Sequence, residues 1–227
     1  MMKKFLILAM LTVGMTAFAQ EGRGKKDITL KDGENDAWTT QLAVGVNLVT
    51  GAPDGYKFAP FKSWDINWTV VQYNYTPNGA SQTYSAGVGL NWRNYGLKDN
   101  NTAFVKNGDL VGLGNFPEGA GSRYSSIRTL SISVPLLFTQ KISDDFSFSV
   151  GPIVNFNAWG WVKRNYEMGD DDFEISTSKI GQTPVTIDVM GVFDFDGLGV
   201  FCKYSPMNVL KTDRGPKFQS VTVGLYL

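Results

Sequence analysis

The sequence predicts an all-β protein: an eight-stranded antiparallel up-and-down transmembrane β-barrel, preceded by a cleaved signal peptide. Three observations predict this fold class. The chain begins with an export signal, and eight later segments alternate apolar and polar residues with a period of two. The connections between those segments are alternately short and long, as in outer-membrane barrels. After the signal, no apolar run approaches the 18 residues that a membrane-spanning helix needs.

The N-terminus has the three parts of a secretory signal. Residues 1–4 are short and basic, residues 5–18 are almost continuously apolar, and Ala17-Phe18-Ala19 supplies the small residues that a signal peptidase requires. We therefore expect a signal peptide at residues 1–19, a periplasmic N-terminal segment at residues 20–37 and an outer-membrane barrel domain at residues 38–227.

Eight segments show the alternation expected of half-exposed strands. They are residues 38–49, 64–75, 84–93, 129–138, 146–157, 185–193, 198–204 and 220–227. Within the second segment the pattern slips by one residue at Val70-Val71, which predicts a β-bulge. Three connections are tight and carry hairpin residues, whereas four are long: residues 50–63, 94–126, 163–184 and 206–217. We expect the long ones to be extracellular loops.

Aromatic residues gather near both ends of the predicted strands. One group lies beside the long connections and comprises Trp64, Trp92, Trp159 and Trp161; the other lies beside the short turns and includes Trp38, Tyr73, Tyr84 and Phe146. Two such bands are the girdles expected where a barrel meets the lipid headgroups. The alternative is a soluble β-sandwich or lipocalin-like barrel, but its core requires neither bands nor alternating connection lengths.

The other face of the predicted strands carries balanced charges. Its ionisable residues are Asp65, Arg93, Asp188 and Lys203, and its amides include Gln41, Asn67, Asn91 and Asn155. The interior of an eight-stranded barrel is just wide enough for side chains to fill it. We therefore expect the two acids and two bases to pair and to plug the lumen, with a narrow pore as the alternative.

Candidate catalytic and metal-binding residues are few. The chain has no histidine and its single cysteine, Cys202, has no base to activate it, so we expect neither an enzyme nor a cofactor. Asp170, Asp171 and Asp172 form a weak candidate metal site, although a solvated acidic loop is the preferred interpretation. The formal charge of zero predicts no nucleic-acid partner.

Two stretches resemble a known family. Leu130 to Phe138, with the sequence LSISVPLLF, and Phe148 to Pro152, with the sequence FSVGP, are similar to paired central strands of the Bacteroidota outer-membrane β-barrel family, called PorT-like or OmpX-like. The end of the chain, from Lys203 to Tyr226, resembles that family's closing hairpin. The resemblance covers most of residues 38–227 and implies an outer-membrane location, with PorT-like members acting in a secretion machine.

Three hypotheses for function follow. The first is a plugged barrel in the cell outer membrane, surrounded by lipids and lipopolysaccharide, whose extracellular loops contact a protein or glycan partner in surface interaction, adhesion or membrane integrity. The second is an accessory component of a secretion machine. The third is a soluble periplasmic β-barrel that binds a ligand.

Overall fold

A computed structural model describes residues 36–77 and 80–227, so the predicted signal peptide lies outside the described residues. The strands are β1 (Asp36–Thr50), β2 (Trp64–Tyr75), β3 (Gln82–Gly96), β4 (Thr102–Asn107), β5 (Leu110–Asn115), β6 (Gly121–Lys141), β7 (Phe146–Met168), β8 (Asp171–Ser178), β9 (Val185–Phe195), β10 (Leu198–Ser205) and β11 (Gln219–Tyr226). Within this part of the chain, the helical element is one 3-10 turn, η1 (Pro60–Lys62).

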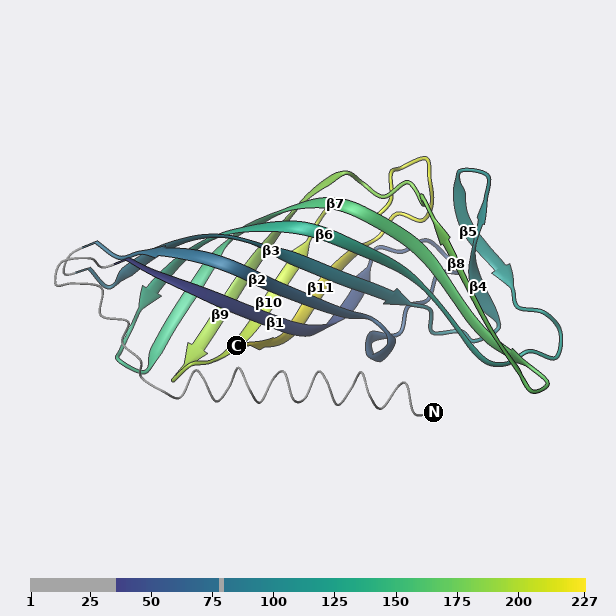
Figure 1. Ribbon diagram of the computed structural model, residues 1–227, viewed down its shortest axis with the longest axis horizontal. Helices are drawn as coiled ribbons and strands as arrows, with labels where there is room; N and C mark the ends of the chain where they lie inside the picture. Colours follow the sequence, from purple (N-terminus) through teal and green to yellow (C-terminus); the bar gives the residue numbers. More distant parts are fainter. Residues whose placement is uncertain (1–35, 78–79) are drawn as a thin grey trace. The chain divides into compact units, whose positions relative to one another are not determined.

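Eight of these strands form a closed ring (Figure 1). The order is β6–β3–β2–β1–β11–β10–β9–β7, and β6 also pairs with β7, so that every ring strand has a partner on both sides. All of these pairings are antiparallel, which confirms the all-β antiparallel prediction. The eight predicted segments are the eight ring strands.

The two ends of the ring differ in their connections. Tight turns join β2 to β3, β6 to β7, and β9 to β10, and we call this the short-turn end. The remaining connections lie at the other end, which we call the long-connection end. The predicted alternation of short and long connections is therefore present in the structure.

Two bulges set which residues face inward. The predicted slip in β2 is confirmed, because the register with β3 shifts between Thr69 and Val71. A second bulge, which the sequence analysis missed, lies in β7: Leu130 pairs with Trp159, whereas the next residue pairs with Asn157. Ala158 is thus the extra residue. A one-residue insertion reverses the alternation, and so both Asn157 and Gly160 belong to the inward set while Trp159 points outward.

The description of residues 94–126 and 163–184 as loops was wrong. β4 and β5 form a hairpin, and β8 pairs with the last third of β7 from Trp161 to Met168. β6 and β7 also extend well past their predicted ends, to 21 and 23 residues. The sequence of these extensions, for example from Gly121 to Arg128, shows no clear alternation of apolar and polar residues. Such alternation arises where one face of a sheet lies against a continuous apolar environment, and the extensions have no such environment.

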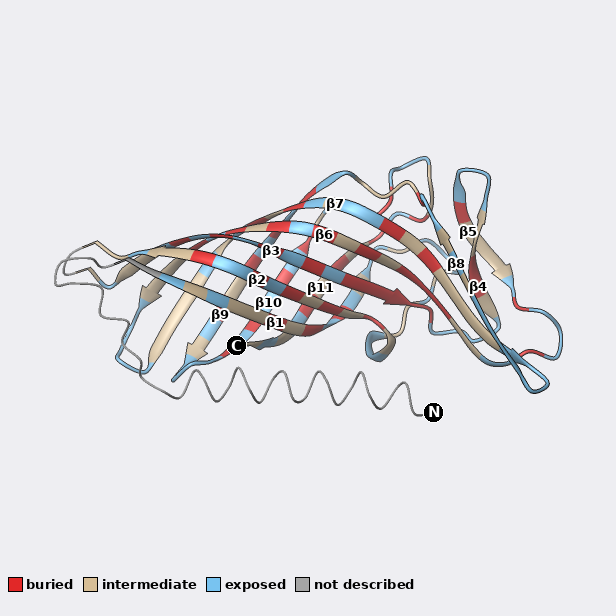
Figure 2. Cartoon of the chain, viewed as in Figure 1, coloured by how far each residue is buried: buried red, intermediate tan, exposed pale blue. Residues whose placement is uncertain are grey.

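Burial alternates along the ring strands (Figure 2). Inward residues form three zones in order along the strands. Near the short turns lies an apolar cluster that includes Leu137, Met190 and Phe201. A polar and charged zone follows. At the long-connection end, a larger apolar cluster is built around Tyr95 and Phe218. The interior was predicted to be polar, and the two apolar clusters modify that picture.

Candidate functional site

The four charged residues predicted for the interior lie together in one buried network. Lys203 Nζ is 2.7 Å from Asp65 Oδ2 and donates a hydrogen bond of 2.9 Å to Oδ1. Arg93 Nε lies 3.5 Å from Asp65 Oδ2, and a second guanidinium nitrogen pairs with Asp188 Oδ2. At most 4% of any of these side chains is exposed. Two acids and two bases therefore neutralise one another out of contact with water.

Amide side chains complete this network. Asn91 Nδ2 donates to Asp65 Oδ1 over 2.7 Å and Asn155 Nδ2 donates to Asp188 Oδ2 over 2.8 Å. Asn67 accepts a longer bond of 3.3 Å from the Ser133 hydroxyl. Gln41 is only half-buried. Buried charges are tolerated when their remaining hydrogen-bonding positions are filled. The amides fill some of these positions, whereas Asp188 Oδ1 and Asn155 Oδ1 have no hydrogen-bond partner among the described residues.

Arg93 and Asp65 face each other on the neighbouring strands β3 and β2, whereas the other two ion pairs join strands that are not neighbours in the ring. Lys203 belongs to β10 and Asp65 to β2, with β11 and β1 between them; Arg93 on β3 and Asp188 on β9 are separated by β6 and β7 on the shorter way round. Contacts of this kind cross the interior. The charged zone consequently obstructs the ring instead of lining an open channel.

The long connections cover one mouth of the ring with apolar side chains. Phe104 from the β4–β5 hairpin is fully buried, and Phe58 packs between it and Phe218 in tilted arrangements, with ring centroids 6.0 Å and 4.8 Å apart. Leu210 comes from the last long connection. Leu110, in the same hairpin as Phe104, instead stays 57% exposed. We call this apolar cluster and its connections the cap.

Polar contacts hold the hairpin in the cap. The amide of Val111 donates to the Arg214 carbonyl over 2.8 Å, and the Arg214 guanidinium pairs with Asp109 at the hairpin turn. The hydrogen bond and positive charge of Arg214 hold the pKa of the Asp109 carboxyl below its usual range. Lys106 Nζ also donates to the Ser178 carbonyl over 3.3 Å. The hairpin is therefore fastened to both the last connection and β8.

The outward face of the ring is apolar around its whole circumference. Each ring strand exposes at least 37% of a large apolar side chain; one from each is Val46, Trp68, Val88, Ile132, Val150, Val189, Val200 and Val223. Cys202 is also exposed on this face. In the described ranges 36–77 and 80–227, no helix is both long and apolar enough to cross a membrane. The arrangement of apolar and charged residues is thus inverted relative to a water-soluble barrel.

The predicted aromatic residues occupy both ends of this outward face. At the long-connection end, the rings of Trp64 and Trp92 meet edge to face at 5.1 Å. At the short-turn end, Trp38 packs on Tyr73 at 5.2 Å and Phe146 stacks on Phe193 at 6.5 Å, while Tyr84 pairs with Phe138. Trp159 is 57% exposed and Trp161 is half-buried.

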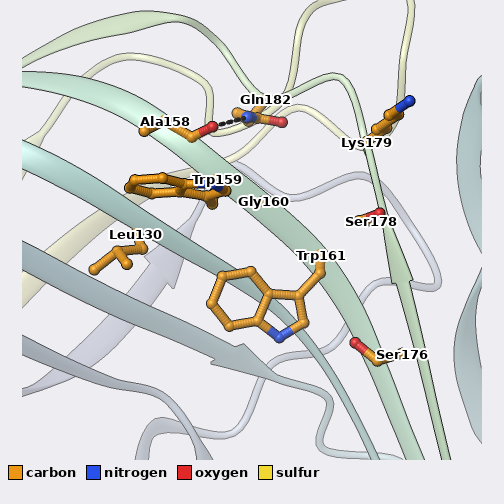
Figure 3. Close-up of a pocket in the computed structure, with 9 residues that line it drawn as sticks. All are labelled: Leu130, Ala158, Trp159, Gly160, Trp161, Ser176, Ser178, Lys179 and Gln182. Carbon is orange, nitrogen blue, oxygen red and sulfur yellow. Dashed lines mark hydrogen bonds between the residues drawn. The ribbon is translucent and has the colours of Figure 1, made fainter.

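An open pocket of about 600 Å³ lies where β6, β7 and β8 meet the connection after β8 (Figure 3). Its apolar side is formed by Leu130, Trp159 and Trp161, and its polar side includes Lys179 and Gln182. Gln182 Nε2 donates to the carbonyls of Asn157 and Ala158, each over 3.4 Å. Gln182 therefore contacts the β7 bulge that turns Trp159 outward.

Trp159 and Trp161 were predicted from the sequence as girdle residues, but the pocket that they line was not predicted. The pocket depends on the bulge at Ala158, which turns Trp159 outward although Asn157 points inward. In the sequence, such a bulge can be recognised only as a break in the alternation of apolar and polar residues. The pocket also needs β8, which lay in a connection read as a loop. Lys179 and Gln182 follow β8 and gave no pattern of their own.

The weak candidate metal site lies where β7 meets β8, with Asp170 between the two strands and Asp171 and Asp172 at the start of β8. Asp170, Asp171 and Asp172 are all exposed. Among the residues that the structure describes, no group of three or more acidic, histidine or cysteine side chains is arranged to hold a metal ion. Their surroundings are those of a solvated acidic turn.

No family model matches the chain, and no curated protein matches it. Among solved structures, the chain is similar to the crystal structure of Ail, the attachment invasion locus protein of Yersinia pestis, with 13% sequence identity and a TM-score of 0.36. A second structure of Ail, in complex with the heparin analogue sucrose octasulfate, gives 13% identity and a TM-score of 0.39. Both matches cover 86% of this chain and 100% of Ail.

Proposed function

We propose that this protein is an outer-membrane β-barrel with a plugged interior, which acts through its long-connection end in surface interaction, adhesion or membrane integrity. The observation that carries the proposal is the inverted arrangement of the ring: charges inside, large apolar side chains outside. In this proposal residues 1–19 are the export signal and residues 20–37 a periplasmic segment that leads into the barrel.

The outward apolar face supports a lipid environment. A soluble monomer rarely leaves a contiguous apolar patch larger than a few hundred Å² in water, whereas this band involves all eight ring strands. The aromatic pairs at the two ends of the strands are suited to the headgroup regions on either side of the hydrocarbon. A closed ring also leaves no strand edge unpaired within the lipid.

The filled interior argues for binding or structural roles and against transport. Ion pairs cross the middle of the ring, and the cap covers one mouth. The same filling disfavours the soluble periplasmic binder, because an eight-stranded barrel needs free internal volume to hold a ligand. We propose no enzymatic activity and no cofactor, since the sequence contains no histidine that could act as a general base or bind a metal.

The long-connection end offers the surfaces for partners. It carries the hairpin, the acidic residues where β7 meets β8, and the aromatic pocket, whereas the connections between described strands at the short-turn end are tight turns. A protein or glycan partner at the cell surface would meet these connections. The secretion-accessory hypothesis from the PorT-like resemblance would instead place a partner at the periplasmic side, on the short turns and residues 20–37.

Site-directed labelling tests both location and orientation. Cys202 is first replaced with serine, and a single cysteine is then introduced at exposed Asp170 or, as the matched control, at exposed Asp145 in the short turn before β7. In intact cells a membrane-impermeant maleimide should label Asp170→Cys and should reach Asp145→Cys only after the outer membrane is disrupted. Recovery of the protein in the soluble periplasmic fraction would overturn the barrel proposal. The opposite labelling pattern would place the cap in the periplasm.

A further inference from the structure

The aromatic pocket adjoins a second, cationic pocket. The first has a volume of about 600 Å³ and the second about 400 Å³. They share Lys179 and Gln182, so the two pockets lie side by side at the long-connection end. The first is lined by Leu130 and Trp159, and the second adds Lys211 and Arg214. We call the two adjoining pockets the composite site.

The apolar part of the composite site continues the outward face of the ring. Trp92 on β3 pairs with Leu130 on β6, which pairs with Trp159 on β7. These three residues form one lateral row, at the level of the aromatic band of the long-connection end. An apolar chain lying against the barrel wall can therefore reach the composite site without crossing a polar barrier.

The cationic part has charge available for a ligand. Arg214 is engaged with Asp109 and lies 3.6 Å from Asp213. For Lys179 and Lys211, no carboxylate of the described residues lies within ion-pair distance, and both are exposed. The amide of Lys211 donates to the Gly181 carbonyl over 2.9 Å, which fixes its backbone beside that of Lys179. Lys179 and Lys211, neither of which has a counter-ion among the described residues, thus both line the cationic pocket.

The backbone around Lys179 is held in an unusual conformation. Lys179 has φ of +57° and Gly181 has φ of +72°. A side chain is uncommon in this left-handed region and costs conformational energy there. At Gly181 an added Cβ would also lie 2.6 Å from Arg214 Cγ. The turn therefore brings a lysine into a position that a glycine would occupy with less strain, which points to a use for its charge.

From these features we propose that the composite site binds an anionic membrane lipid. Its phosphate-bearing headgroup would lie between Lys179 and Lys211, and an acyl chain would lie on Leu130 and Trp159. The inference rests on the proposed membrane location. It is more specific than general contact with lipid, because it requires negative charge and an apolar chain in the same ligand. Basic residues at a membrane surface attract anionic lipids, and tryptophan is suited to this depth.

Lipid binding to the purified full-length protein tests the inference. The protein is held in zwitterionic detergent micelles and titrated with dioleoyl phosphatidylglycerol carrying brominated acyl chains, and quenching of tryptophan fluorescence is measured. Dioleoyl phosphatidylcholine with the same brominated chains reports binding without net negative charge. We expect the phosphatidylglycerol to bind at least about tenfold more tightly than the phosphatidylcholine.

Charge-matched variants locate the binding. Lys179→Gln with Lys211→Gln should reduce the phosphatidylglycerol affinity about tenfold or more. The control, Lys57→Gln with Lys98→Gln, removes the same charge from exposed positions at the same end of the ring and should change the affinity less than twofold. Equal losses in both double variants would overturn the composite site as the binding position.

Soluble anions distinguish the source of the phosphate. Inorganic phosphate and sucrose octasulfate are each added as competitors. Displacement of the lipid by either one at concentrations below that of the lipid would overturn the inference in favour of a soluble anion or sulfated glycan. The expected result is no displacement, because neither competitor has an apolar chain. Membrane fractionation of the same variants is scored separately: if they remain in the membrane without lipid preference, this inference fails while the proposed location stands.

Discussion

The interior ion network should respond to substitution as a coupled unit. Lys203→Met keeps most of the side-chain length but removes the ammonium that contacts both oxygens of Asp65, at 2.7 Å and 2.9 Å. Loss of one partner of a buried ion pair costs about 3–5 kcal/mol, because the other charge is left uncompensated. Arg93 remains 3.5 Å from the same carboxylate. We therefore expect the lower part of that range, about 3 kcal/mol.

The double variant provides the decisive comparison. Asp65→Asn combined with Lys203→Met leaves Arg93 and Asp188, one base and one acid, so the interior is again neutral. The double variant should be less destabilised than the sum of the two single variants by about 2 kcal/mol, within the range found for contacting residues. If the two effects were additive within about 0.5 kcal/mol, the residues would be energetically independent and the network interpretation would be refuted.

The assay is equilibrium unfolding in lipid vesicles. Urea titrations followed by tryptophan emission give the free energy of unfolding, provided that unfolding is reversible and two-state. The fraction of protein with the faster gel mobility of an unheated barrel gives an independent measure of folding. Lys98→Met, at an exposed position, is the matched control and should change the free energy of unfolding by less than about 0.5 kcal/mol.

Four further outcomes are expected. Val134→Arg, on the outward face of β6, should destabilise the inserted barrel by about 2–4 kcal/mol in vesicle unfolding, whereas Asp144→Arg in a short turn should have little effect; equal effects would contradict the assigned faces. Deletion of Ala158 should turn Trp159 inward and lower the folded fraction on unheated gels. If quenching of tryptophan fluorescence by brominated lipid were unchanged, the assignment of the bulge to Ala158 would be contradicted. Because the pKa of Asp109 is lowered, its ion pair with Arg214 stabilises the hairpin at neutral pH, and this stability is lost as the pH falls through that pKa, below the ordinary value of 3.8. The hairpin amides of the wild type should therefore lose hydrogen-exchange protection at acid pH. The variant Asp109→Asn should show no such transition. Planar-bilayer recordings should show no steady single-channel conductance, and large stable steps would refute the plugged interior.

Strand positions were predictable wherever the chain faces two different environments. In β6, Ser131 and Ser133 are fully buried while Ile132 is 42% exposed, and this contrast is written into the sequence as strict alternation. The same rule placed Asp188 and Lys203 on the buried face. Their pairing across the ring could not be predicted from alternation, because it depends on the stagger between strands and not on the face.

The cap and the composite site were less accessible to sequence reasoning for a physical reason. β4, β5 and β8 pair through backbone groups, and their side chains meet water or one another instead of a uniform apolar phase. Such strands have no period-two signature. Buried Phe104 and exposed Leu110 are both large apolar residues in the same stretch, and only their positions in the hairpin decide which one reaches the cap.

The pairing of β1 with β11 has a consequence for biogenesis. These strands lie far apart in the sequence and join along eight residue pairs, from Ala43 with Tyr226 to Thr50 with Gln219. The ring cannot close until the last strand has been synthesised and exported, and contacts of such long range form slowly. Lys203 and Asp65, 138 residues apart, lie on opposite sides of that seam. In the proposed membrane location, Lys203 would be held apart from Asp65 until the seam closes, which would leave Arg93 alone beside that carboxylate. We therefore expect stable insertion to require the pairing of β11 with β1, and partly assembled intermediates in the bilayer to be disfavoured.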